Sequence, residues 1–149
     1  MGSYLAKNIL VPVDGSKYME RNVRYACDMA KSMAARLTLL HVVTVPSPAQ
    51  LEPYIVEPQP FDTTPFEQAG SKILEKARQI VKETGMDSET RMETIAGNPA
   101  QTIIHVAEMG KFDLIVLGAK GHSLLRTLMV GSVCDAIIHN APCAVLVVR

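Results

Sequence analysis

Asp113-Leu114-Ile115-Val116-Leu117-Gly118-Ala119-Lys120-Gly121 is the stretch that says most about the fold of this chain of 149 residues. Residues 113–117, apolar after one aspartate, are typical of a parallel strand that is buried on both faces. Glycines follow where this strand should end, and Gly131-Ser132 comes after nine intervening residues. Glycine lets backbone N–H groups approach a ligand closely, and the start of a helix offers unpaired N–H donors. The spacing favours a phosphate-binding loop, with ordinary strand-end and cap chemistry as the alternative.

This loop differs from the two most familiar nucleotide motifs. No Gly-Lys-Ser/Thr follows a glycine at the Walker spacing, and the sequence contains no Gly-x-Gly-x-x-Gly. The prediction of a phosphate site therefore depends on the paired glycines at one end of the loop and the Gly-Ser pair at the other.

Composition indicates a globular protein. Hydrophobic residues make up 48% of the chain and charged residues 20%, which excludes a disordered polypeptide. The formal net charge is zero, so we expect neither a nucleic acid nor a membrane surface as a partner. No apolar run approaches ~20 residues, so no transmembrane helix is predicted, and the first residues lack a signal-peptide pattern. The three cysteines form no Cys-x-x-Cys pair and indicate reduced, buried thiols in a cytoplasmic protein.

Predicted strands and helices alternate along the chain, which indicates a single α/β domain over residues 1–149. Ser16, Asn98 and Ser132 are the predicted N-caps, and Thr64-Pro65-Phe66-Glu67 is a predicted capping box. The alternation predicts a five-stranded parallel sheet of order 3-2-1-4-5 with helices on both faces. The third strand alternates polar side chains and suits one edge of the sheet. Strands are expected at 8–13, 37–43, 88–96, 113–117 and 143–148, and helices at 17–35, 65–84, 99–110 and 133–140.

Residues 44–64 interrupt this alternation. Proline fixes φ and cannot donate to a ladder, so the prolines here exclude a regular helix and a central strand. A loop of this length inside a compact domain is uncommon and tends to be functional or mobile. A variable insertion and a lid or partner-contact segment remain the two interpretations. The prolines are Pro46, Pro48, Pro53, Pro58 and Pro60.

In the expected strand order, the ends of the first and fourth strands meet at one crevice. Asp14 lies there, where a carboxylate can accept hydrogen bonds from a ribose hydroxyl or help to hold Mg²⁺. A turn aspartate before a glycine is the alternative. Pro12 cannot donate to the ladder, so the first strand should be irregular or unpaired at that point. The backbone of Val42, at the end of the second strand, could read the edge of a purine beside the same crevice.

The histidines and the loop lysine give weaker indications. His41 is best interpreted as a packed, hydrogen-bonded imidazole, and His105 and His139 as structural residues on helices. His122 and Lys120 belong to the glycine loop and could contact a phosphate, with exposed loop side chains as the alternative. A single acidic residue with no base nearby is a weak arrangement for hydrolysis.

Together these motifs resemble the universal stress protein family. The resemblance covers essentially the whole chain and includes a complete Gly-x-x-Gly-x9-Gly-Ser/Thr motif. It implies a Rossmann-like fold of the adenine nucleotide alpha hydrolase type, a homodimer, and membership of the branch that binds ATP. The stretches that carry it are residues 11–16, 40–42, 113–121, 131–133 and 140–148.

The resemblance also implies a role for individual residues in binding an adenine nucleotide. Lys120 stands at a position where many family members carry arginine or histidine. The implied contacts are Asp14 and Gly118 to the ribose, Pro12, Val13 and Val42 to the adenine, and Gly121, Gly131, Ser132 and Val133 to the phosphates.

The resulting hypothesis is an ATP-binding regulatory protein that works as a homodimeric, nucleotide-dependent switch. AMP or ADP could take the place of ATP, and Mg²⁺ could assist through Asp14. A slow ATP hydrolase and a nucleotide-free dimeric interaction protein are the alternatives. We expect the dimer to form through the C-terminal strand, because an apolar edge strand invites pairing. Coverage of that edge by residues 44–64 is the competing possibility.

Overall fold

A five-stranded parallel sheet forms the centre of the computed structural model, which describes residues 5–51, 60–119 and 131–149. Across the sheet the strands run in the order β3-β2-β1-β4-β5, and each neighbouring pair is parallel. The predicted fold class and strand order are confirmed. The strands are β1 (Asn8–Pro12), β2 (Arg36–Thr44), β3 (Glu89–Ile95), β4 (Leu114–Gly118) and β5 (Ala144–Val148).

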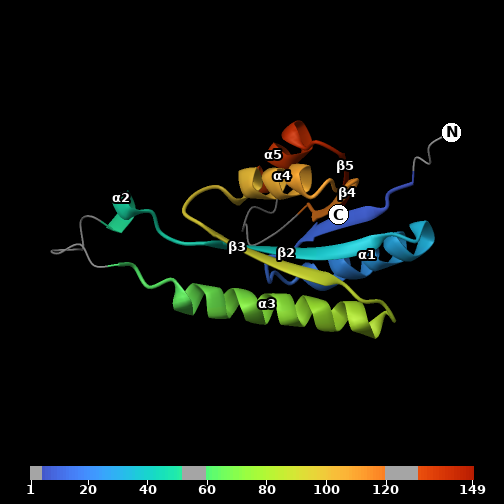
Figure 1. Ribbon diagram of the computed structural model, residues 1–149, viewed down its shortest axis with the longest axis horizontal. Helices are drawn as coiled ribbons and strands as arrows, with labels where there is room; N and C mark the ends of the chain where they lie inside the picture. Colours follow the sequence, from blue (N-terminus) through green and yellow to red (C-terminus); the bar gives the residue numbers. More distant parts are fainter. Residues whose placement is uncertain (1–4, 52–59, 120–130) are drawn as a thin grey trace.

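Helices cover both faces of this sheet, as predicted (Figure 1). α1 (Met19–Met33) and α3 (Thr64–Glu83) lie on one face, and α4 (Pro99–Met109) and α5 (Ser132–Asn140) lie on the other. Side chains of a strand alternate between faces, so each face has its own buried cluster. Val11, Val23, Leu39, Ala77 and Val116 belong to the first cluster, and Leu10, Leu40, Ile103, Ile115 and Ile137 belong to the second.

The pairing between β1 and β4 is shorter than the pairing on either side of it. β1 pairs with β2 at five positions, from Asn8↔Arg36 to Pro12↔Leu40, and β4 pairs with β5 at five positions. In the described residues, β1 and β4 pair at two positions, Ile9↔Leu114 and Leu10↔Ile115. The prediction for Pro12 is therefore half right: it keeps its register with β2 and has no partner on β4. The centre of the sheet opens toward its carboxyl end.

Of the predicted N-caps, the one at Asn98 is correct. Its Oδ1 accepts a hydrogen bond from the Ala100 N–H at 2.9 Å, with Pro99 in the first turn. Ser16 is not a cap, because α1 begins only at Met19 and Tyr18 takes the cap position without a side-chain hydrogen bond. The Ser16 N–H is instead bound by Asp14, which places Ser16 inside a turn that precedes the helix.

The other two predicted caps are displaced by one residue. Gly131 is the N-cap of α5, and Ser132 is already the first helical residue. Thr63 is the N-cap of α3, again without a side-chain hydrogen bond, so the predicted capping box does not form. The carboxylate of Glu67 accepts a hydrogen bond from the Thr94 hydroxyl at 3.2 Å and so links α3 to β3 instead.

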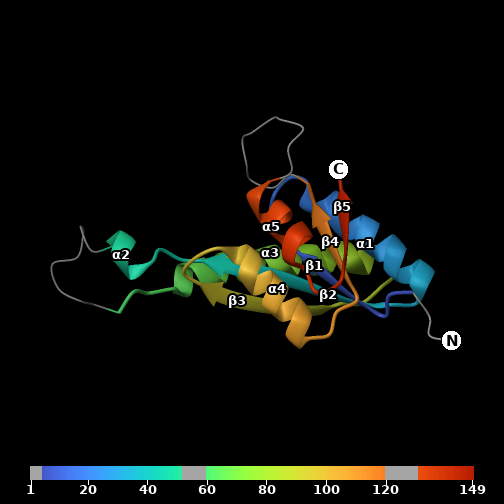
Figure 2. The same ribbon diagram turned by 90° about the horizontal axis from the view of Figure 1, so that it is seen from above.

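The predicted irregular segment 44–64 is partly regular. Thr44 belongs to β2, and a four-residue helix, α2 (Pro48–Leu51), follows. Proline is tolerated in the first helical turn, where its missing N–H would have had no partner, so the prediction that the prolines exclude a helix is wrong here. Residues 52–59 lie outside the described residues. Figures 1 and 2 both place α2 far from β5, so this described part of the segment does not cover the β5 edge.

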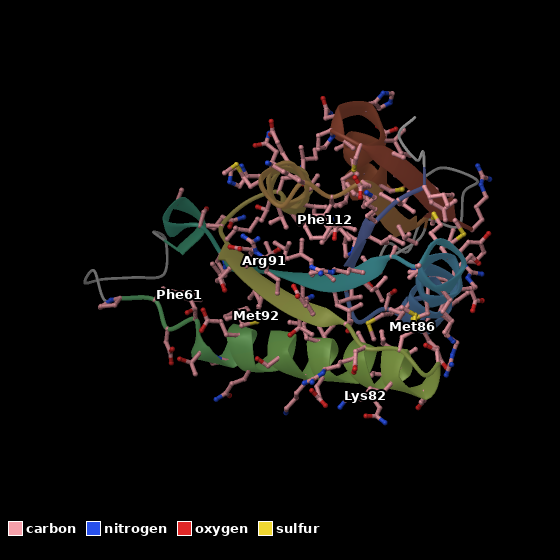
Figure 3. The ribbon with its side chains drawn as sticks, turned by 45° about the vertical axis from the view of Figure 1, so that its right-hand side comes forward. Phe61, Lys82, Met86, Arg91, Met92 and Phe112 are labelled. Atoms are coloured by element: carbon pink, nitrogen blue, oxygen red, sulfur yellow. The ribbon has the colours of Figure 1, made fainter. Side chains whose placement is uncertain are left out.

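β3 forms the opposite edge of the sheet and is polar, as predicted. Figure 3 shows Met92 pointing from β3 toward α3, while Arg91 projects from the other face of the strand. Met92 packs against the α1/α3 cluster, and Arg91 forms a salt bridge of 2.8 Å with Glu93. One face of this edge strand is thus anchored and the other is charged, which discourages pairing with another chain.

Candidate functional site

A cavity of about 440 Å³ lies at the carboxyl ends of β1, β2 and β4, beside the first turn of α5. This is where the pairing of β1 and β4 has ended, and ligands of parallel α/β sheets bind at such a point. Of the predicted site residues, Pro12, Val13, Asp14, Val42, Gly118, Gly131, Ser132 and Val133 line it. The other three, Lys120, Gly121 and His122, lie outside the described residues.

Backbone hydrogen bonds bring the two ends of the predicted phosphate loop together. The Ala119 N–H donates to the carbonyl of Val148 at 2.8 Å, which continues the β4–β5 pairing beyond Gly118. The Gly131 N–H donates to the carbonyl of Ala119 at 3.3 Å. The residue after β4 and the N-cap of α5 are therefore neighbours at the cavity wall, although eleven residues separate them in the sequence.

A second set of hydrogen bonds fixes the end of β1 against β2. The Val13 N–H donates to the carbonyl of Leu40 at 2.8 Å, and His41 donates from Nδ1 to the carbonyl of Val13 at 2.6 Å. His41 is thus the packed, hydrogen-bonded imidazole that the sequence predicts. Backbone groups along a strand alternate in direction, so Val42 turns its N–H and carbonyl to the same side as Leu40. On that side β1 has ended and the cavity begins.

Asp14 forms a tight turn at the mouth of β1. Its Oδ1 accepts a hydrogen bond from the Ser16 N–H at 2.9 Å, and Gly15 between them has a φ of +74°. A Cβ at position 15 would also lie 3.0 Å from Ile73, so both conformation and space require glycine there. The alternative interpretation of Asp14 as a turn residue is therefore correct in its geometry. The same carboxylate also lines the cavity.

Gly131 differs from Gly15 because its conformation is open to any residue. Its φ of −60° and ψ of 158° are ordinary extended values. A Cβ there would have the Ala119 carbonyl oxygen as its nearest described neighbour, at 3.9 Å. Within the described residues, neither backbone strain nor packing accounts for this glycine.

The first turn of α5 faces the cavity with backbone donors. Ser132, Val133 and Cys134 all line it, and no side chain caps the helix. The first N–H groups of a helix lack partners within the helix, and its dipole makes this end electropositive. Asp135 is the first residue whose N–H reaches back into the helix, with a bond of 2.8 Å to the Gly131 carbonyl.

Asn22 is the lining residue that sequence reasoning missed most clearly. It lies on α1 within the buried stripe of Met19, Val23 and Ala26, and it is 8% exposed. Its Oδ1 is buried and has no hydrogen-bond partner among the described residues. A Cβ at Gly118 would lie 2.1 Å from its Nδ2. The available signal was an amide on an otherwise apolar helix face, which a search for apolar periodicity passes over.

The described lining has little charge. Asp14 and His41 are its acidic and basic side chains, and neither lysine nor arginine lines the cavity within the described ranges. Burial raises the pKa of the Cys134 thiol, and the charge of Asp135 adds to the rise. His105 and His139 lie elsewhere on exposed helix surfaces, where His139 pairs with Asp135 at 3.4 Å.

The described residues contain no group of three histidine, cysteine, aspartate or glutamate side chains that could hold a metal ion. None of the helices they form is long and apolar enough to cross a membrane.

Known proteins resemble this chain over nearly its full length. The model of the universal stress protein family matches residues 6–149. A universal stress protein of Methanocaldococcus jannaschii is 32% identical over 99% of this chain and 85% of its own length. The solved structure of UspA from Lactobacillus plantarum is 29% identical, covers both chains completely and superposes with a TM-score of 0.71.

A second solved structure was determined with a ligand. It is a universal stress protein in complex with cAMP, 25% identical to this chain, with a TM-score of 0.71 over 97% of this chain and 98% of its own. The matching family model, the curated relative and the similar solved structure agree with one another, and this chain belongs to the universal stress protein family.

Proposed function

We propose that this protein binds ATP in the cavity between β1, β4 and α5 and acts as a homodimeric, nucleotide-dependent regulatory switch. The observation that carries the proposal is the convergence of Asp14, Gly118 and the first turn of α5 on one cavity of about 440 Å³. Ligand pockets of this kind run from about 300 to 1,000 Å³. The cavity is therefore large enough for a nucleotide.

Each part of the nucleotide has a chemically suitable counterpart in the cavity. The backbone of Val42 and the apolar side chains of Leu40 and Ile103 suit a purine ring. The Asp14 carboxylate suits a ribose hydroxyl. The N–H groups at the start of α5 suit phosphate oxygens, because backbone donors and the helix dipole both favour an anion.

Gly131 supports the phosphate end of this assignment. Its φ is ordinary and a Cβ would fit the described protein, so glycine at this N-cap is consistent with close approach of a ligand to the backbone. Within the described lining, which holds no lysine or arginine, backbone donors would meet the phosphates, and a metal ion could add positive charge there. Mg²⁺ is commonly held by one or two carboxylates together with substrate phosphates, and Asp14 could serve as that carboxylate.

The solved relative in complex with cAMP supports adenine nucleotides as the ligand class. ATP as the ligand, in preference to ADP or AMP, rests on the complete glycine motif of residues 118–132. A triphosphate would use the glycines at both ends of that segment.

We expect this protein to hydrolyse ATP very slowly or not at all, which makes a regulatory role a better fit than an enzymatic one. Asp14 binds the Ser16 N–H, and His41 donates its Nδ1 proton to Val13, so both groups already have structural tasks. A general base must reach the water that it activates. A slow ATP hydrolase remains the second candidate, and phosphate release that exceeds the protein-free control but stays below about 1 s⁻¹ would favour it. Release at ordinary enzyme rates, on the order of 1–10³ s⁻¹, would show that the cavity holds a catalytic group.

The β5 edge supports a homodimer. β5 is apolar, pairs with β4 on one side and forms the end of the sheet, and its central residues are half-buried. A two-fold partner strand would pair the free edge and close the assembly. Sedimentation at micromolar concentration checks this part: we expect a dimer that Val147→Pro dissociates, and a monomeric wild type would contradict it.

The nucleotide proposal is tested by titrating nucleotide-free protein with ATP, ADP, AMP and GTP in the presence of Mg²⁺. We expect ATP to bind at least about tenfold more tightly than GTP, near 1.4 kcal/mol, because Val42 and its neighbours contact the base. Denaturation of freshly purified protein should release an adenine nucleotide, which mass spectrometry identifies. Failure of all four nucleotides to bind would contradict the proposal.

A further inference from the structure

Asn22 is a buried polar side chain that the fold does not explain. It is 8% exposed, and within the part of the chain that the structure describes its Oδ1 has no hydrogen-bond partner. Buried polar groups are nearly always hydrogen-bonded, and one left without a partner destabilises the folded protein. Alanine, a better helix former, would suit this position on the buried stripe of α1. The packing of the helix therefore does not account for an amide at this position.

The position of Asn22 indicates that its amide serves the cavity. Its side chain and Asp14 both line the nucleotide cavity, and its Nδ2 lies against Gly118. A Cβ at Gly118 would come within 2.1 Å of that nitrogen, so the glycine leaves the space that the amide occupies. Asn22 and Gly118 thus form one unit on the wall of the cavity beside Asp14.

We propose that the Asn22 amide hydrogen-bonds to a ribose hydroxyl of the bound nucleotide and makes this protein select against the 2′-deoxy or 3′-deoxy analogue that lacks this hydroxyl. This inference rests on the proposed function, in which Asp14 and Gly118 contact the ribose. An amide carries a donor and an acceptor that exchange places by rotation of the group, and a hydroxyl can both donate and accept. Whichever amide atom faces the cavity can therefore meet the sugar.

The selectivity follows from what happens when the hydroxyl is missing. A site built to hydrogen-bond a hydroxyl rejects an analogue that lacks it, because a buried polar group is then left without a partner. In the ligand-free fold the buried Oδ1 of this amide already lacks a partner among the described residues. A nucleotide with the contacted hydroxyl would give the amide a hydrogen bond, and the analogue without that hydroxyl would not.

The test compares ATP, 2′-deoxy-ATP and 3′-deoxy-ATP by calorimetry on the wild type, Asn22→Leu and Asn22→Ala. We expect the wild type to prefer ATP by about tenfold over the analogue that lacks the contacted hydroxyl. In both variants that preference should fall below about twofold, while the affinity for that analogue stays unchanged. Thermal unfolding of the ligand-free variants should show stability equal to or above that of the wild type, because a buried group without a partner is removed.

Asn140→Ala is the matched control, since that asparagine is exposed at the end of α5 and bonds within its own helix. Its preference for ATP should equal that of the wild type. If ATP binds and the ribose preference is the same with and without Asn22, the inference is wrong and the proposed function stands. If the wild type binds no adenine nucleotide, both are wrong. Loss of stability in both Asn22 variants with an unchanged preference would assign the amide to the fold.

Discussion

The two ends of the contact between β1 and β4 use their polar groups in opposite ways. At the amino end, Asp113 Oδ2 accepts hydrogen bonds from the N–H groups of Lys7 and Asn8, each at 2.9 Å. The Asp113 N–H also donates to the Asn8 carbonyl at 2.9 Å. At the carboxyl end, pairing stops after Leu10↔Ile115, and the strands diverge around the cavity.

This difference shows how one sheet separates stability from binding. At the amino end, the Asp113 carboxylate accepts hydrogen bonds from backbone N–H groups at the start of β1. The polar groups at this end are therefore committed to the fold. The carboxyl end carries another carboxylate, Asp14, and a buried amide, Asn22, beside open space. Substitutions at the first end should change stability and spare ligand binding. Substitutions at the second end should weaken ligand binding, and should lower stability only where they create a steric clash.

Gly118→Ala should have the largest effect, because it adds a Cβ only 2.1 Å from the Asn22 amide. Overpacking of a tight site costs about 1–3 kcal/mol, and the displaced amide would fill part of the cavity. We expect ATP affinity to fall about 100-fold or more, measured by calorimetry, together with a lower unfolding midpoint.

A double variant separates the two consequences of that substitution. Gly118→Ala combined with Asn22→Ala removes the clash, so denaturant unfolding should recover most of the lost stability. Affinity should remain low, since the ribose contacts are still missing. Full recovery of ATP binding would mean that the glycine serves packing alone.

Asp14→Asn should weaken ATP binding by about tenfold or more and leave stability nearly unchanged. Asparagine keeps the acceptor for the Ser16 N–H and hence the turn, but it loses the negative charge. A hydrogen bond to a charged group contributes about 1.5–3 kcal/mol. Calorimetry and thermal unfolding on the same samples measure both quantities, and an equal ATP affinity would remove Asp14 from the proposed site.

Asp113→Ala should produce the reverse pattern. It deletes the acceptor of two backbone N–H groups, and because the site is exposed we expect a loss of about 1–2 kcal/mol in the free energy of unfolding. ATP affinity should stay within about twofold of the wild type. A large loss of affinity with little loss of stability would show that the two ends of the contact are not independent.

The smallest expected effect concerns the cysteines. Burial raises the pKa of Cys134, in the cavity, and of Cys143, outside it, so both thiols are mostly protonated at pH 7.5. Alkylation by iodoacetamide should be slow there and accelerate as the pH rises past the usual value of about 8.5. ATP at three times its Kd should slow the modification of Cys134 about fourfold and leave Cys143 unaffected, as measured by mass spectrometry of the peptides.

The sequence predicted the sheet well because apolar strand runs and the β–α alternation are strong, repeated signals. Eight predicted site residues lie at one cavity, since carboxyl ends of parallel strands share an edge whatever their separation in sequence. The prediction of Ser16 as an N-cap is wrong because Asp14 accepts a hydrogen bond from the Ser16 N–H in a turn, and the helix begins only at Met19. Competition between a local turn and a helix start depends on geometry that composition does not contain.

Asn22 could not be predicted for a related reason. Periodicity identifies which face of α1 is buried, but it does not say which neighbour each buried side chain meets. The pairing of Asn22 with Gly118 joins a helix and a strand that are distant in the sequence. Only the packed sheet shows that the glycine leaves room for the amide.

Gly131→Val gives the most direct test of the central claim that the open end of the β1–β4 contact is a nucleotide site. Among the described residues a Cβ at this position meets only the Ala119 carbonyl oxygen, at 3.9 Å, whereas phosphates held against the backbone would collide with the added side chain. Asn140→Val, at the other end of α5, is the control. We expect calorimetry to show ATP affinity reduced about 100-fold or more in Gly131→Val alone, near 2.8 kcal/mol, with unfolding midpoints of both variants close to the wild type. Equal ATP affinity in all three proteins would contradict the account.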